Sequence, residues 1–282
     1  MKNLLGIHHV TAITGDAQMN IDFYAGKLGL RLVKKTVNFD DPNSYHLYFG
    51  DKSGSPGSLI TFFAWPSAAK GRIGESEPVS VRFQIPKGTL AWWNARLGTL
   101  ELADPDGMRV ELVEGNEPSA SPAIQRIHSV KLNLRDPQLS ASLFTSQLQF
   151  TQIENNRFQV GDCYVDIQRG GGGRGMMGAG AIHHVAFRTE DDASQQEWLQ
   201  HVARLGLHVS PVMDRNYFHS IYFREPSGVL FEIATDLPGM AVDEPAAHLG
   251  EKLMLPPQYE GSRKQLEATL PPLTTPALEA RI

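Results

Sequence analysis

The sequence predicts an α+β fold built from four copies of one unit, a strand followed by a helix and three further strands. The tetrapeptide Ile-His-His-Val occurs at residues 7–10 and again at 182–185. Each copy opens a strand-like run that leads into an amphipathic helix and then into short extended segments. A unit that carries histidines is therefore predicted to be duplicated, and tandem βαβββ modules are the expected architecture.

The first unit is predicted to contain a strand from Ile7, a helix from Asp16, and strands over 31–37, 45–49 and 58–65. Asp16 is a favourable helix N-cap, because its carboxylate can accept hydrogen bonds from free backbone N–H groups. A glycine follows the last apolar position of the helical pattern, as is common at helix ends. Turn-rich segments separate the three later strands.

The last unit repeats this order. A strand is predicted over 182–188, a helix over 193–205, and further strands over 209–213, 220–223 and 229–235. The dipeptide Tyr-Phe occurs at matching places in the third strand of the first and last units. The match supports a common origin for the two units.

Two weaker copies lie between them, at 79–113 and 127–167. The copy at 79–113 is short, and we expect it to have lost most of one strand. The chain is accordingly divided into an N-terminal half (1–120), a C-terminal half (121–240) and a tail (241–282). The tail is expected to dock on the body through apolar residues at 253–255 and to contain a helix over 261–269.

Register selects one candidate ligand in the first strand of each unit, because alternate side chains of a strand point to opposite faces. With His9 and His184 as the reference, the corresponding residues of the two middle units are Ser80 and Ser129. Alternation places the other histidine of each pair on the opposite face. The first and last units therefore carry the histidines of one candidate site.

The last strand of each unit supplies a second set of candidates, counted from the glycine of the preceding turn. The first, second and fourth units offer Thr61, Glu111 and Glu232, and the third offers Val165 or Asp166. The first and last units together thus provide two histidines, one carboxylate and one threonine. The middle units provide acids and serines, and Glu111 is expected to be solvated or ion-paired.

His9, His184 and Glu232 are the candidate metal ligands. A lone histidine on a strand is more often a hydrogen-bonded core residue. Two in one register, with a carboxylate in an apolar strand, favour a metal site, because an unpaired buried charge is costly. Two imidazoles and one carboxylate on one face of an ion are typical of non-heme Fe(II) oxygenases. Since threonine is a poor ligand, Thr61 predicts a site open to substrate and O2.

Four further residues are candidates for substrate contact. His183, Arg215 and Tyr222 could hold or deprotonate a phenolic substrate, and Thr11 lies one alternation beyond His9 on the same face. Each has a simpler interpretation that remains open. Arg215 could form a surface salt bridge, and Tyr222 could be a core aromatic residue.

Composition excludes several other classes of function. The formal net charge is −5 with interspersed acids and bases, so neither nucleic acid nor an anionic membrane is an expected partner. We find neither a secretory segment at the start nor an apolar run of about 20 residues, and expect a cytoplasmic protein. With Cys163 as the only cysteine, an intrachain disulfide is excluded.

The glycine-rich segment 170–180 is expected to be a mobile connector, with a lid over the site as the alternative.

The Ile-His-His-Val openings, the segment 214–236 and the Leu-Pro-Pro of the tail resemble ring-cleaving dioxygenases of the hydroquinone dioxygenase type. These belong to the vicinal oxygen chelate (glyoxalase/bleomycin resistance) superfamily, and the resemblance covers nearly the whole chain. It implies βαβββ modules paired into two open barrel-like halves. It further implies Fe(II), with Mn(II) as the alternative, and insertion of both atoms of O2 into the ring of a hydroquinone.

Carried over by position, the resemblance makes His9, His184 and Glu232 the metal ligands. It also places four residues beside the metal or against the aromatic substrate, namely His183, Arg215, Tyr222 and Thr11. Two other functions remain open on the same fold. One is a glyoxalase-like isomerase that uses zinc or nickel as a Lewis acid, and the other is a non-catalytic protein that binds an aromatic drug. A homo-oligomer is also possible.

Overall fold

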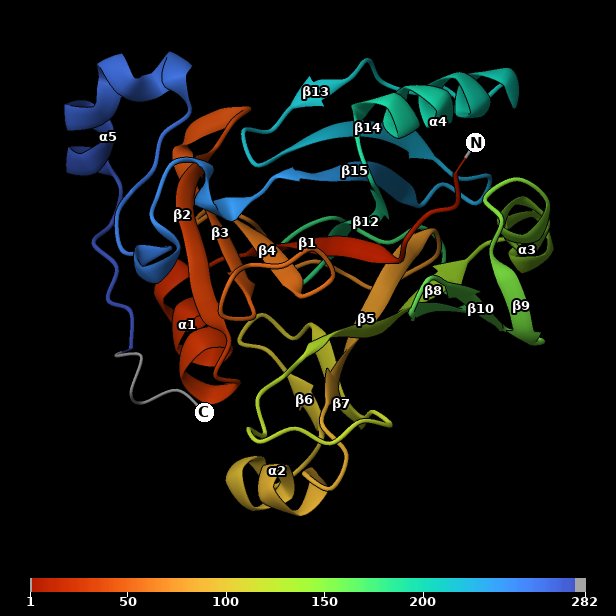
Figure 1. The fold of residues 1–282 in the computed structure, drawn as a ribbon, viewed down its shortest axis with the longest axis horizontal. Helices are drawn as coiled ribbons and strands as arrows, with labels where there is room; N and C mark the ends of the chain where they lie inside the picture. Colours follow the sequence, from red (N-terminus) through yellow and green to blue (C-terminus); the bar gives the residue numbers. More distant parts are fainter. Residues whose placement is uncertain (1, 277–282) are drawn as a thin grey trace.

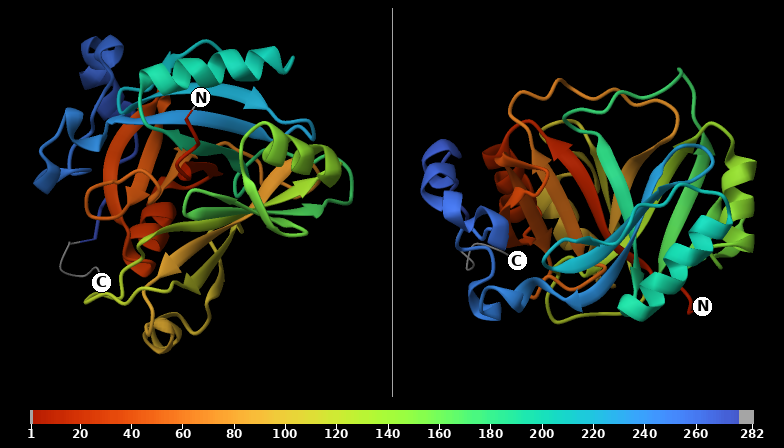
Figure 2. Two further views of the ribbon diagram at one scale, coloured as in Figure 1. Left: turned by 45° about the vertical axis from the view of Figure 1, so that its right-hand side comes forward. Right: turned by 90° about the horizontal axis from the view of Figure 1, so that it is seen from above.

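The structure is a computed structural model that describes residues 2–276 and contains two curled sheets with few helices (Figures 1 and 2). The first and last modules follow the predicted order. The first contains β1 (Ile7–Thr14), α1 (Ala17–Ile21), η1 (Asp22–Lys27), β2 (Arg31–Asn38), β3 (Asp41–Gly50) and β4 (Leu59–Ala64). The last contains β12 (Ile182–Thr189), α4 (Asp192–Arg204), β13 (Met213–Asp214), β14 (Phe218–Arg224) and β15 (Leu230–Pro238).

The two middle modules differ in completeness. The third contains β8 (Arg126–Leu134), α3 (Pro137–Ser146), β9 (Thr151–Glu154), β10 (Arg157–Val160) and β11 (Cys163–Arg169). The second contains only β5 (Glu77–Ile85), α2 (Leu90–Leu97), β6 (Glu101–Ala103) and β7 (Arg109–Glu114). One strand is thus missing from this part of the described chain, as predicted, and α2, β6 and β7 project at the bottom of Figure 1.

The sheets pair the outer modules with each other and the inner modules with each other. The eight-stranded sheet has the order β13-β14-β15-β12-β1-β4-β3-β2, and the seven-stranded sheet has the order β6-β7-β5-β8-β11-β10-β9. The antiparallel contacts of β1 with β12 and of β5 with β8 join the modules. Each sheet therefore takes one module from residues 1–120 and one from 121–240. The division of the chain at residue 120 therefore describes the repeat in the sequence and remains a proposal. The two sheets do not coincide with these two halves.

Three local predictions need correction. The helix after Asp16 turns into the π-helical segment Asp22–Lys27, although Asp16 does cap it by accepting hydrogen bonds from the N–H groups of Gln18 and Met19. The turn-rich segment between the strands predicted at 31–37 and 45–49 is shorter than expected, because β3 already begins at Asp41. The strand predicted over 209–213 is reduced to β13, because Pro211 lacks an N–H and the Ser210 hydroxyl accepts the hydrogen bond of the Tyr222 N–H.

The glycine-rich segment 170–180 pairs with the segment 69–75. Its backbone exchanges hydrogen bonds with the segment 69–75, including the reciprocal pair between Arg72 and Met176. A side chain at Gly178 would collide with the carbonyl of Ala69, so the close approach of the two segments requires glycine. These contacts argue against a freely mobile connector. Among the described residues, none of this segment lines the pocket next to the candidate metal ligands.

The tail covers the edge of the larger sheet. Leu253 forms a backbone bridge to Lys35 on β2, and the N–H of Met254 donates to the Lys35 carbonyl. The buried Lys34 ammonium lies 2.5 Å from both Asp243 and Glu244. Both views of Figure 2 show the blue tail on the outer side of the first module. These contacts hold the described part of the tail on the first module, and a helix, α5 (Arg263–Thr269), lies within the predicted range 261–269. Residues 277–282 lie outside the described part.

Short 3-10 turns complete the tail, over Met240–Val242, Ala246–His248 and Pro257–Ser262. No helix within residues 2–276 has the length and apolar character needed to span a bilayer.

Through its contacts with β2, the tail covers the edge strand of the larger sheet. The free N–H and C=O groups of such an edge could otherwise pair with another chain.

The smaller sheet holds an ion-paired cluster where the larger sheet holds its histidines. Arg82 on β5 donates from Nε to Glu111 at 2.5 Å and from Nη1 to Asp166 at 2.9 Å. Arg157 forms a bidentate contact with the same Asp166 carboxylate. Register makes Asp166, not Val165, the counterpart of Glu232. The expected ion pairing of Glu111 is confirmed, and a guanidinium occupies the centre of this sheet.

Replacing Arg82 by leucine is expected to lower the free energy of unfolding by about 3 kcal/mol, because Glu111 and Asp166 are largely buried and lose a shared cation. Urea unfolding followed by circular dichroism measures the change. The exposed Arg109 on β7 gives the matched control, for which Arg109→Leu should change stability by no more than about 0.5 kcal/mol. Equal effects of the two substitutions would contradict the structural importance of the Arg82 cluster.

Candidate metal centre

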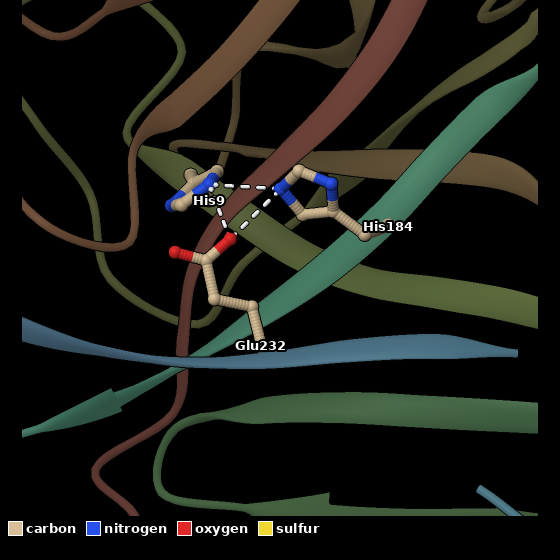
Figure 3. Close-up of side chains that lie close together, drawn as sticks. All are labelled: His9, His184 and Glu232. Atoms are coloured by element: carbon tan, nitrogen blue, oxygen red, sulfur yellow. Dashed lines mark hydrogen bonds and ion pairs between the residues drawn. The ribbon is translucent and has the colours of Figure 1, made fainter. Parts of the chain in front are cut away.

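Three side chains from the first and last modules converge in the larger sheet (Figure 3). His9 comes from β1, His184 from β12 and Glu232 from β15. Glu232 Oε2 lies 3.4 Å from His9 Nε2 and 2.9 Å from His184 Nε2, and the two Nε2 atoms are 3.3 Å apart. All three residues are buried. Within residues 2–276, no other group of His, Cys, Asp or Glu converges in this way.

The geometry of this triad fits a divalent metal ion. Metal–ligand bonds of about 2.1 Å at right angles place neighbouring ligand atoms about 3 Å apart. The three measured separations lie close to that value. Glu232 Oε1 accepts a 2.5 Å hydrogen bond from Ser220, whereas the buried Oε2 has only the two imidazole nitrogens as its polar neighbours. A buried carboxylate oxygen left in this way is costly without a cation, so the donor set favours a metal.

Bulges in β1 and β12 place a second histidine beside each ligand. The pairing of the two strands skips His8 on β1 and His183 on β12. A bulge redirects the side chain of the extra residue. His8 Nδ1 therefore lies 2.9 Å from His9 Nδ1, and His183 Nδ1 lies 2.7 Å from His184 Nδ1. The prediction that alternation separates the histidines of each pair onto opposite faces is thus corrected.

Electrostatics favour neutral histidines beside the ligands. Burial, and then the neighbouring His184, lower the pKa of His183 to about 3. Burial and His9 likewise lower the pKa of His8 well below its usual range. A neutral imidazole can accept the Nδ1–H of the ligand histidine, which leaves the ligand's Nε2 lone pair directed at the metal. His8 and His183 are therefore suited to orient His9 and His184.

The carboxylate of the triad stays ionised. Burial by itself raises the pKa of Glu232, but the imidazoles of His9 and His184 outweigh that effect and hold the pKa well below its usual range. For His184 the effect of burial is larger than that of Glu232, and its pKa is lowered. The centre therefore presents one negative oxygen and a neutral imidazole nitrogen, which are suitable ligands for a transition metal.

A pocket opens beside the triad and contains three of the four predicted substrate-contact residues. Thr11, Arg215 and Tyr222 line it together with His9 and His184. Its remaining walls are largely aromatic and come from Phe39, Tyr48, Phe63 and Phe218. An apolar pocket with a few convergent polar groups is typical of a small-molecule site.

His183 does not line this pocket. It borders a separate cavity, next to Arg135, Arg174 and Arg224. Its closest polar contact is the 2.7 Å approach to His184 Nδ1. The structure therefore brings His183 to a metal ligand rather than to the space for a substrate.

Arg215 and Tyr222 act together at the pocket wall. Arg215 Nε donates to Tyr222 Oη at 3.3 Å, and the guanidinium lies over the phenol ring at 5.5 Å. Burial, and then the charge of Glu232, raise the pKa of Tyr222, so its hydroxyl stays protonated. Arg215 also approaches the exposed Asp40 at 3.5 Å, at the rim of the pocket. The alternatives of a simple surface salt bridge and a simple core aromatic describe only part of these contacts.

Sequence reasoning missed His46, which also lines the pocket. Its Nε2 lies 2.9 Å from Thr61 Oγ1, and its Nδ1 lies 3.1 Å from Tyr48 Oη. Thr61 Oγ1 lies 2.8 Å from Thr11 Oγ1, so both hydroxyls and the imidazole form one polar chain. The signal was present in the sequence, since His46 precedes Tyr48 of the repeated Tyr-Phe pair by one alternation and shares its face.

The fold and site define a member of a known superfamily. The family described as the Glyoxalase/Bleomycin resistance protein/Dioxygenase superfamily matches residues 6–112 and 126–233, and the chain belongs to it. The two matched segments reflect the duplication seen in the sequence.

Particular relatives include ring-cleaving enzymes. The chain is 43% identical over 310 residues to MhqO of Bacillus subtilis, a candidate ring-cleaving dioxygenase, with 99% of each chain covered. It is 32% identical over 308 residues to the chlorohydroquinone/hydroquinone 1,2-dioxygenase of Sphingobium indicum, covering 94% of this chain and 95% of that protein.

Solved structures agree with this placement. A crystal structure of a candidate dioxygenase from Bacillus subtilis is 42% identical with a TM-score of 0.93, covering 98% of this chain and 99% of that one. Glyoxalase I from Zea mays, 15% identical with a TM-score of 0.60, covers 82% of this chain and 92% of its own and shares the fold alone.

Proposed function

We propose that this protein is a ring-cleaving dioxygenase that uses Fe(II) to open the ring of a hydroquinone or related phenol with O2. The observation that carries the proposal is a buried His/His/Glu triad beside an aromatic-lined pocket, with Thr61 at the position where a fourth ligand could stand. The names of the relatives support the same reaction and substrate class. Mn(II) would be accepted by the same nitrogen and oxygen donors.

His9, His184 and Glu232 would hold the metal. When bound, Fe(II) supplies a centre that brings a phenolic oxygen and O2 together and passes electron density between them. Arg215 and the Tyr222 hydroxyl would orient the phenolic oxygen, because both are donors on one wall of the pocket. Thr11 adds a hydroxyl on the same side as His9. His183 would act through His184, by accepting its Nδ1–H.

A glyoxalase-like isomerase is the second candidate on this fold, and Thr61 argues against it, because a threonine hydroxyl is a weak ligand. A non-catalytic aromatic-binding protein would leave Glu232 Oε2 buried without a compensating cation. The proposed partners are therefore a small aromatic substrate and O2. The proposal also includes a cytoplasmic location.

Oxygen uptake tests the proposal. The protein is reconstituted anaerobically with Fe(II), freed of excess metal and mixed with oxygenated methyl- or chlorohydroquinone in an oxygen electrode. We expect uptake of about one O2 per ring, and no uptake by protein loaded with zinc. Iron-loaded protein that consumes no oxygen with any member of a phenol panel would contradict the proposal. Turnover of a thiol adduct of an α-ketoaldehyde by the zinc form, without oxygen, would instead favour the isomerase.

A further inference from the structure

His46 is a polar side chain of the pocket to which neither metal binding nor the Arg215–Tyr222 pair assigns a role. It lies on β3 opposite Phe63 of β4, one alternation beyond the level of Tyr48 and Thr61. Its ring packs on those of Tyr48 and Phe63, with centroids 4.2 Å and 4.6 Å apart. Burial, and then the neighbouring His9 and His184, lower its pKa well below the usual range. His46 is thus a neutral imidazole in the pocket wall.

The duplication shows what His46 replaces. Tyr222 pairs with Glu232 in the last module, and Tyr48 pairs with Thr61 in the first, so these positions correspond. One alternation before each tyrosine, the last module has Ser220, which donates to the metal-facing carboxylate, and the first has His46, bonded to Thr61. A carboxylate held by a serine in one module therefore corresponds to a threonine held by a histidine in the other.

This exchange leaves space at the metal and a polar group further away. Threonine is shorter than glutamate, and the Thr61 hydroxyl bonds to Thr11 and His46. The β3 strand rises about 3.3 Å per residue, which places His46 about 7 Å further along the sheet than Tyr48. Phe218 packs on His9 and Phe63 packs on His46, so aromatic side chains line the route between the triad and His46.

We propose that His46 is a substrate-contacting residue that recognises a hydroxyl group at the end of the aromatic ring remote from the metal. The inference rests on the proposed function and assigns the residue that would recognise the second hydroxyl of its substrate. A neutral imidazole donates from one nitrogen and accepts at the other, as a hydroxyl group also does. When Nε2 turns to the substrate, Thr61 keeps a hydrogen bond with Thr11, so neither threonine is left unpaired.

Discrimination follows from the cost of an unpaired polar group. A ring with a methyl group in place of the second hydroxyl would separate His46 Nε2 from Thr61 without offering a hydrogen bond in return. A site built to bond a hydroxyl rejects an analogue that lacks it, because its own buried donor or acceptor is left unsatisfied. His46 would therefore determine the preference for hydroquinone over an alkylphenol.

Calorimetric binding without oxygen tests this inference independently of turnover. The Fe(II)-loaded protein is titrated anaerobically with hydroquinone and with 4-methylphenol. We expect the wild type to bind hydroquinone about 10- to 100-fold more tightly, and His46→Phe to reduce that preference to less than about threefold by weakening hydroquinone alone. Metal content should be unchanged. The control His128→Phe, a similar replacement in the smaller sheet, should keep the preference of the wild type.

Three outcomes overturn the inference: no preference in the wild type, an unchanged preference in His46→Phe, or equal weakening of both ligands, which indicates a structural brace. If His46→Phe does not fold, His46→Leu and His46→Gln decide, because glutamine keeps a donor and an acceptor and should retain part of the preference. The proposed function fails separately. Wild-type protein that binds hydroquinone through His46 but consumes no oxygen would refute the dioxygenase and leave this inference intact.

Discussion

Replacing Glu232 by glutamine is expected to abolish tight metal binding and to lower the rate of oxygen uptake by more than about 100-fold. Loss of a residue that only supports a metal ligand already lowers affinity or activity by up to about 100-fold, and loss of a ligand should cost more. The substitution keeps the shape of the side chain and its contact with Ser220. It removes the negative charge of the only carboxylate in the triad. Metal analysis after reconstitution and an oxygen electrode measure the two effects.

Stability distinguishes a metal ligand from a structural ion pair at this position. If Glu232 were held only by ion pairs with His9 and His184, its neutralisation should cost about 3 kcal/mol of unfolding free energy in metal-free protein. We expect no such loss, because glutamine removes a fully buried negative charge that no metal ion balances in the metal-free protein. Glu111→Gln is the matched control, since it lies at the corresponding position of the second module and should leave metal binding intact.

Replacing Thr61 by glutamate is expected to abolish ring cleavage while metal is retained. Thr61 corresponds by register to Glu232, so a carboxylate there should become a fourth ligand and close the position needed by substrate or O2. We expect at least about a 1000-fold loss of oxygen uptake, a value in the range seen when essential catalytic groups are removed. Metal analysis should still give one ion per chain.

Thr61→Val separates the new ligand from the loss of the hydroxyl. Valine has nearly the same shape but breaks the bonds to Thr11 and His46, so we expect bound metal and a smaller loss of activity. Full oxygen uptake by Thr61→Glu would show that this position does not face the metal.

The candidate triad could be predicted because period-two alternation is reliable over a short buried strand. His9 and His184 lie in the same register of duplicated strands, and Glu232 stands alone in an apolar run. The structural convergence of these three residues follows from the pairing of β1 with β12 and of β12 with β15. That pairing explains why the first and last modules, far apart in the chain, share one sheet.

Other features could not be derived from alternation. The bulges at His8 and His183 insert one residue into each strand, and no local pattern marks them. They turn neighbouring histidines towards the ligands, where alternation placed them on the opposite face. The order of the glycine-rich segment depends on contacts with residues 69–75, about a hundred positions earlier. His46 was missed because its partners Thr61 and Tyr48 become neighbours only through sheet pairing.

Anomalous diffraction from crystals of the iron-loaded protein tests the metal centre most directly. The geometry of the triad predicts one iron peak per chain, about 2.1 Å from Nε2 of His9, Nε2 of His184 and Oε2 of Glu232. The smaller sheet should show none, because Arg82 already occupies the space between Glu111 and Asp166. An iron peak at another position, or its absence from this triad in crystals that contain iron, would contradict the assignment.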